Sequence, residues 1–182
     1  EHRDFLGTLF ARFAAVAANN PQAWFRDAHS AARIATPTAD NRYVGYPYTK
    51  LMNAIIAVDQ AASVVMTTEA HATELGIDRS RWVYPMGGAD LNDVWHVTER
   101  PDLARSPAIR LAASRALDQA GCRVEDVTEF DLYSCFPAAV ELATDALDLD
   151  DDDPRPLTIT GGLPYFGGPG NNYSMHAIAT AV

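Results

Sequence analysis

Five glycines fall within ten residues, in the run TGGLPYFGGPGNN at 160–172. Glycine permits positive φ and lets another group approach the backbone closely. The run follows a short apolar stretch at 157–160 and precedes a helix-like tail at 173–182. A loop placed between a strand and a helix directs free N–H groups into a crevice where open α/β sheets bind ligands. It matches neither the dinucleotide nor the phosphate-loop pattern. A ligand loop and a merely structural turn are therefore equal alternatives.

A second strand-to-helix junction lies upstream. Residues 129–133 (EFDLY) are typical of a strand, and Pro137 suits the first position of the helix that follows. Tyr133, Ser134 and Cys135 would then lie beside a helix N-terminus, which favours negative charge. Cys135 is a candidate nucleophile of lowered pKa, although a buried, inert thiol is the commoner outcome.

Three further side chains are candidates for acid–base work. Tyr133 and Tyr165 occupy the two loops, and a tyrosine of pKa near 10 donates to a hydroxyl or, with help, deprotonates it. His176 falls one turn into the helix after the glycine-rich run. A packing role is the alternative for each of them. The candidate catalytic residues are thus Tyr133, Tyr165, His176 and Cys135.

The order of segments in the second half resembles the C-terminal half of the thiolase superfamily, with the sterol-carrier-type thiolases and thiolase-like proteins as the nearest branch. The segments are SPAIRLAASRALDQAGCRV, EDVTEFDLYSCFPAAVELA and TITGGLPYFGGPG. Upstream, YPYTKL and VDQAASVV are similar to the segment that re-enters the N-terminal thiolase half. The resemblance runs from about residue 41 to the end of the chain.

The resemblance implies an active site that departs from the family pattern. The family closes its strand with Asn-Glu-Ala-Phe, where this chain has Tyr133, Ser134, Cys135 and Phe136. Gly168 stands where the family has the catalytic histidine of Gly-His-Pro. In the family that asparagine and histidine form an oxyanion hole, and such donors contribute roughly 3–4 kcal/mol each. Losing both would cripple ordinary Claisen chemistry unless other groups replace them.

The family fold implies which residues would border the thioester. The expected substrate-binding residues are Gly161, Gly162, Gly167, Gly168 and Phe136. We expect Tyr133, Gly168 and the glycine-rich run to border one acyl-thioester pocket.

The expected fold class is α/β, a thiolase-like mixed sheet covered by helices with a helical insertion. Residues 1–55 would form the insertion, 56–80 the end of the N-terminal domain, and 81–182 an incomplete C-terminal domain. Strands are expected at 61–67 and 81–86, besides the two junction strands.

Three helices are expected from local patterns. Apolar residues recur at helical spacing over 3–18, and a second helix is expected over 21–33. Ser106 and Gly121 would cap a third helix, whose buried face would include Leu111.

Charge and composition narrow the partners. With 24 acidic and 14 basic residues the net charge is −10, which argues against nucleic acid. Arg33, Arg42 and Lys50 are the nearest cations for the phosphates of coenzyme A. No apolar run is long enough to span a membrane, and two cysteines suit a reducing compartment such as the cytoplasm. No metal and no permanently bound cofactor are expected.

Three functions follow from the resemblance. The first is an acyltransferase of the acetyl-CoA acetyltransferase class, acting on coenzyme A thioesters in lipid or sterol metabolism. The second is a retro-aldolase of sterol side-chain CoA esters, and the third a non-catalytic acyl-CoA-binding protein. Expected partners are acyl-CoA, the remainder of a thiolase chain, a second copy in a homodimer and a small OB-fold protein. The chain lacks an initial methionine, so we expect a fragment that is inactive alone, with any nucleophilic cysteine elsewhere.

Overall fold

The computed structural model describes residues 1–182 and is built mainly of helices and extended segments. The α-helices are α1 (His2–Asn19), α2 (Ala31–Ala35), α3 (Glu69–Glu74), α4 (Pro107–Ala120), α5 (Pro137–Ala146) and α6 (Tyr173–Ala181). Two short strands, β1 (Tyr43–Gly45) and β2 (Tyr48–Thr49), pair antiparallel. No helix is both long and apolar enough to cross a membrane.

Helix α1 lies at the centre of the core, as its apolar spacing predicts. Leu6, Phe10 and Phe13 repeat every three or four residues and are buried. Burial of each such side chain stabilises the fold by about 1.5–3 kcal/mol. The backbone of α2 approaches closely, because a Cβ on Gly7 would lie 2.5 Å from the carbonyl oxygen of Ala31.

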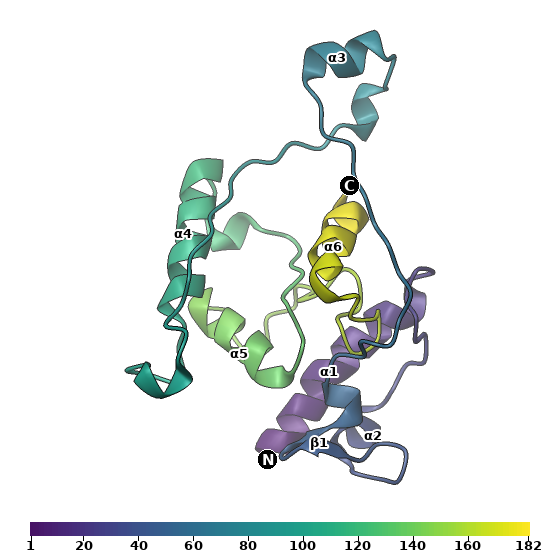
Figure 1. Cartoon of the computed structure of the whole chain (residues 1–182), viewed down its shortest axis with the longest axis vertical. Helices are drawn as coiled ribbons and strands as arrows, with labels where there is room; N and C mark the ends of the chain where they lie inside the picture. The colour runs from purple at the N-terminus through teal and green to yellow at the C-terminus, as the bar shows by residue number, and fades with distance from the viewer.

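One hydrophobic core joins the two ends of the sequence. From the first half of the chain, α1, α2 and Met52 contribute side chains to this core. From the second half, Val140 in α5, Tyr173 in α6 and four residues between them contribute. In Figure 1 the yellow glycine-rich loop and α6 lie beside purple α1. The core thus crosses the expected boundaries between residues 1–55 and 81–182, and the domain division itself stays a prediction.

The caps of α4 and α5 agree with the sequence. The Ser106 hydroxyl accepts the N–H of Ile109, Pro107 is the first helical residue, and Gly121 closes α4 at φ 66°. Pro137 opens α5 in the same way. The expected buried face of α4 is wrong, since no residue of this helix is buried and Leu111 is 44% exposed. In Figure 1 α4 lies at the edge of the molecule, with α5 packed beside it.

The expected second helix over 21–33 is also wrong. Only α2 is helical there, because the N–H groups of Trp24 and Phe25 donate to the carbonyl oxygens of Phe166 and Tyr165, both over 2.9 Å. A segment whose N–H groups bond to another segment cannot use them in a helix.

The expected mixed sheet is not formed. The segments 61–67, 81–86, 129–133 and 157–160 contain no strand, and the single sheet is the β1–β2 pair. A strand requires a ladder of backbone hydrogen bonds. Segments 129–133 and 156–160 share two backbone hydrogen bonds, from the Phe130 N–H to the Pro156 carbonyl and from the Leu132 N–H to the Leu157 carbonyl. The first two segments lie on the long arm that carries α3 away from the core in Figure 1, where no neighbouring strand is present.

Candidate functional site

The structure brings the two strand-to-helix loops together. The buried Ser134 hydroxyl accepts the Leu163 N–H over 3.0 Å, which joins one loop directly to the other. Ala54 and Ile55 bind both loops, because Ala54 N–H donates to the Cys135 carbonyl (2.8 Å) and Ile55 N–H to that of Leu163 (3.2 Å). The serine at the family's glutamate position is therefore a fixed structural acceptor here.

Asp131 holds the same loops at a second point. Its Oδ2 accepts the Thr158 and Thr160 hydroxyls, at 3.0 and 2.9 Å, and the N–H groups of Ile159 and Thr160, both at 3.0 Å. Its Oδ1 accepts the Tyr173 hydroxyl at 2.7 Å. Sequence reasoning missed Asp131. A carboxylate in an apolar segment, with two threonines in the neighbouring expected strand, was the available signal.

The glycine-rich run lies within the core, not at the mouth of a crevice. Gly161 (φ 113°) and Gly162 (φ 78°) press on α1: their Cβ atoms would lie 2.6 Å from the Ala17 Cα and 2.5 Å from the Phe13 ring. Their N–H groups donate to the hydroxyls of Thr158 and Thr160. These N–H groups are therefore not free for a ligand, and the expectation that the loop directs them outward is wrong at these two positions.

Gly167 and Gly168 are also packed. A Cβ on Gly167 would contact the amide of Gln60, whose Nε2 donates to the Phe166 carbonyl over 3.0 Å. A Cβ on Gly168 would lie 3.4 Å from both the Ala54 Cβ and the Ile55 carbonyl oxygen. That is ordinary contact for a methyl group, and Gly168 itself is buried. The expected space at the family's histidine position stays a prediction.

Tyr165 packs in the core. Its ring is 0% exposed, and its hydroxyl donates to the Leu51 carbonyl over 2.8 Å. Burial raises the pKa of this hydroxyl well above its usual range. In this arrangement Tyr165 packs in the core, and its part in catalysis stays a prediction.

Cys135 and His176 are not arranged as reagents. Burial raises the pKa of the Cys135 thiol, which is the opposite of the lowering expected beside a helix N-terminus. Partial desolvation favours the neutral thiol over the thiolate. Burial also lowers the pKa of His176, whose ring packs against Phe166 at 5.2 Å between centroids and whose buried Nε2 has no hydrogen-bond partner.

Tyr133 differs from the other three candidates. It is 46% exposed, and its hydroxyl makes no hydrogen bond within the chain. Its ring meets the Tyr173 ring edge-on, at 5.7 Å and 88°. Phe136, at the position that agrees with the family, is likewise exposed and stacks on Tyr48 at 6.2 Å.

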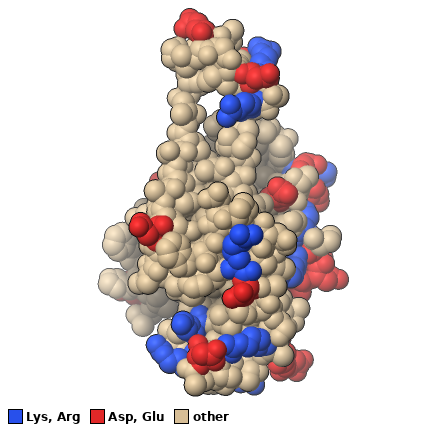
Figure 2. Space-filling view, turned by 90° about the vertical axis from the view of Figure 1, so that its right-hand side faces the viewer, with Lys and Arg blue, Asp and Glu red and all other residues tan.

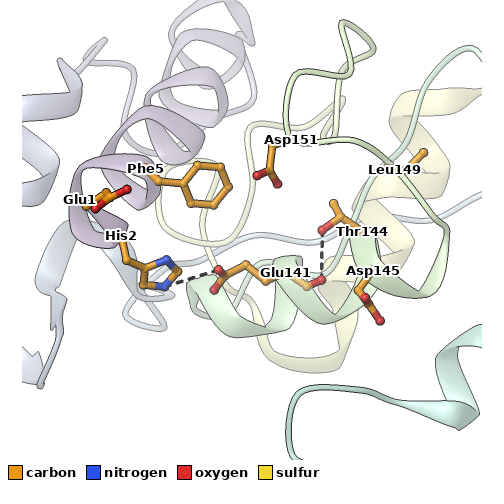
Figure 3. A pocket seen from close by; sticks show the side chains of 8 residues that line it. All are labelled: Glu1, His2, Phe5, Glu141, Thr144, Asp145, Leu149 and Asp151. Carbon is orange, nitrogen blue, oxygen red and sulfur yellow. Dashed lines mark hydrogen bonds and ion pairs between the residues drawn. The ribbon is translucent and has the colours of Figure 1, made fainter.

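One hollow lies elsewhere, between the start of α1 and α5. This cavity of about 680 Å³ is lined by Glu1, His2, Phe5, Glu141, Thr144, Asp145, Leu149 and Asp151. Figure 3 shows the His2 ring turned toward the Glu141 carboxylate, 3.5 Å from Nε2 to Oε1. The excess of carboxylates makes this cavity a poor site for the phosphates of coenzyme A.

The three expected cations do not form a free basic patch. Arg33 pairs with the Asp40 carboxylate and donates to Thr38, and Arg42 donates to the carbonyl of Tyr43. Lys50 remains exposed. In Figure 2 basic and acidic residues are intermixed at the lower end of the molecule. No group of three or more His, Cys, Asp or Glu side chains is placed to hold a metal ion.

A comparison with solved structures places this arrangement among known proteins. The chain is similar to a crystal structure of a monomeric SCP2-thiolase-like protein type 1 from Mycobacterium smegmatis, with 43% identity and a TM-score of 0.87. The match covers 98% of this chain and 39% of that one. No protein-family model and no curated protein matches the chain. The recognition of a thiolase-like fold is thus confirmed. The related protein is described as monomeric, so the comparison does not support the expected homodimer.

Proposed function

The chain belongs to the thiolase superfamily and is of the SCP2-thiolase-like kind, and from this premise we propose that it forms part of a protein that acts on coenzyme A thioesters. It spans only 39% of the related protein's length, so the activity proposed is that of the whole polypeptide. Within that polypeptide, Tyr133 is the side chain that this segment presents to the thioester.

The state of the Tyr133 hydroxyl carries the proposal. Among the four candidate catalytic residues, Tyr133 is the one that is exposed and has a hydroxyl group without a hydrogen-bond partner in the chain. Tyr165 is engaged with Leu51, and burial disfavours the charged forms of Cys135 and His176. A group that acts on a substrate must reach it and must have a free donor or acceptor.

In acyl transfer, the Tyr133 hydroxyl would donate to the thioester carbonyl oxygen, the task of the family's asparagine–histidine pair. A donor aimed at developing negative charge is worth about 3–4 kcal/mol. The thiolate nucleophile would come from elsewhere in the polypeptide, since burial raises the pKa of Cys135. Acyl transfer in lipid or sterol metabolism is therefore the first candidate reaction.

Retro-aldol cleavage of a CoA ester is the second candidate. It requires a base that takes the proton of a β-hydroxyl group and does not require a pair of cysteines. The observation that favours it is the glycine at position 168 together with the engaged Ser134, because both depart from the Claisen machinery. Tyr133 would then act as the base that takes this proton.

We also propose a cellular location, a ligand and partners for the protein. The two cysteines are unpaired, which accords with a cytoplasmic location. The proposed ligand is acyl-CoA, and the proposed covalent context is the rest of a thiolase polypeptide. A small OB-fold partner is proposed from the family resemblance alone.

The test compares Tyr133→Phe with Tyr46→Phe in the polypeptide that contains this chain. Both changes remove one hydroxyl that has no partner, and Tyr46 lies on the exposed β1–β2 hairpin. Two reactions are measured: thiolysis of short and long 3-ketoacyl-CoAs by coenzyme A, which breaks the Cα–Cβ bond to give acetyl-CoA and a shortened acyl-CoA, and cleavage of β-hydroxyacyl-CoA. Calorimetry gives the affinity for acyl-CoA. We expect Tyr133→Phe to lower kcat/KM roughly 100-fold or more with affinity within about twofold, and Tyr46→Phe to match the wild type.

Other outcomes decide against parts of the proposal. Full activity of Tyr133→Phe would remove Tyr133 from the chemistry. Binding of acyl-CoA by the wild type without turnover in either assay would identify a non-catalytic acyl-CoA-binding protein. Absence of binding would refute the coenzyme A assignment.

A further inference from the structure

Asp131 and Tyr133 lie two residues apart on one extended segment, so their side chains project to the same side. Asp131 is half-buried, and its carboxylate accepts five hydrogen bonds. Four come from Thr158, Ile159 and Thr160, which open the glycine-rich loop, and one comes from Tyr173. No basic side chain pairs with this carboxylate, and its hydrogen-bond donors belong to two other segments of the chain.

Tyr173 connects Asp131 to Tyr133. Its hydroxyl donates to Asp131 Oδ1 over 2.7 Å and lies 2.8 Å from the Thr160 hydroxyl. Its side chain is 1% exposed, which fixes the ring position. The edge-on contact of 5.7 Å then sets one side of the space that the Tyr133 ring can occupy.

We propose that Asp131 is a positioning residue that sets the orientation of the Tyr133 ring through Tyr173. The carboxylate fixes the Tyr173 hydroxyl, and the Tyr173 ring limits the rotation of the exposed Tyr133 ring beside it. Edge-to-face contacts of this kind are favourable beyond the area that they bury, which favours one rotamer of a surface side chain. The effect of Asp131 on catalysis rests on the proposed function of Tyr133. The effect of Asp131 on the orientation of the Tyr133 ring does not depend on that function.

The alternative is that the Asp131 cluster only holds the two loops together. A purely structural cluster would lower stability when altered and would leave the Tyr133 ring as it was. The two explanations therefore separate on the environment of the Tyr133 ring, measured in variants that remain folded.

The experiment places 3-fluorotyrosine at position 133 of the full polypeptide and records its ¹⁹F resonance. Tyr173→Phe keeps the ring and removes only the hydroxyl that Asp131 fixes, and Asp131→Asn keeps the shape of the side chain. Tyr165→Phe is the matched control, because it also removes one buried tyrosine hydroxyl, the one bonded to Leu51. We expect both test variants to shift or broaden the resonance, and the control to leave it in place.

A kinetic arm then distinguishes this inference from the proposed function. If Tyr133 acts on substrate, Tyr173→Phe should lower kcat roughly 10- to 100-fold with KM within about twofold, since a small misplacement of a reacting group has that cost. An unchanged resonance in the folded Tyr173→Phe variant would overturn the inference whatever the activity. A shifted resonance in a protein whose turnover does not need Tyr133 would uphold the positioning and refute the catalytic role. Should Asp131→Asn fail to fold, Tyr173→Phe alone decides.

Discussion

Replacing Gly161 by alanine tests the placement of the glycine-rich loop against α1. The backbone at Gly161 has φ 113°, a conformation that side chains rarely adopt. Holding a residue with a Cβ there costs about 1–3 kcal/mol. The added methyl group would also lie 2.6 Å from the Ala17 Cα and 2.8 Å from its backbone nitrogen, so helix backbone must move. Overpacking of this kind costs another 1–3 kcal/mol or so.

The expected loss of unfolding free energy is therefore about 2–6 kcal/mol, a large share of the roughly 5–15 kcal/mol of a typical domain. Urea unfolding followed by circular dichroism measures it, in the polypeptide that contains this chain. Two control glycines separate the contributions. Gly170 has φ 60° with open space around it, so Gly170→Ala should cost only about 1–2 kcal/mol. Gly88 has neither constraint, so Gly88→Ala should be neutral or slightly stabilising.

The order of the three variants is the decisive result. If Gly161→Ala costs no more than Gly170→Ala, the contact with Ala17 is absent in solution. The loop would then not be packed against α1. Such a result would refute the burial of the loop at Gly161 and leave the ligand-loop interpretation open.

Two further predictions concern titration. The hydrogen bonds from Arg155 hold the pKa of Asp153 at about 2, below its usual 3.8. A carboxyl group whose pKa is lower in the folded state than in the unfolded state stabilises the fold fully above its unfolded-state pKa, and this stabilisation is lost as the pH falls toward its folded-state pKa. The Asp153→Asn variant should therefore show a flatter dependence of the unfolding free energy on pH between about pH 4 and 2. Burial raises the pKa of the Cys135 thiol, so iodoacetamide at pH 8 should alkylate Cys135 more slowly than free cysteine. Peptide mass spectrometry measures the rate. Alkylation at or above the rate of free cysteine would show that Cys135 is a thiolate.

The local features of the helices were determined by the sequence alone. The apolar repeat of α1, the Ser106 cap with Pro107, and the end of α4 at Gly121 depend on residues within one or two turns of each other. The same holds for Pro137 at the start of α5. The thiolase resemblance was also readable, because the order of its segments along the chain is a property of the sequence.

The expected sheet and the site depended on contacts between distant segments. Strand propensity at 61–67 and 81–86 could not supply the neighbouring strand that a ladder requires. A glycine-rich run permits close approach but does not say what approaches. The tertiary structure decided that it is α1, more than a hundred residues away in the chain, and this buried the run.

The same long-range contacts decided which candidate residues are buried and hydrogen-bonded and which remain exposed. Tyr133 and Tyr165 are equivalent as residue types, yet only Tyr165 lies where the Leu51 carbonyl can accept its hydroxyl. Cys135 shows the same limit, since a helix N-terminus was visible in the sequence but the desolvation that raises the thiol pKa was not. Asp131 gained its five donors only when the segments 158–160 and α6 folded beside it. Residue types set the chemistry that is possible, and burial and hydrogen bonding between distant segments decided which of these groups remain free to act.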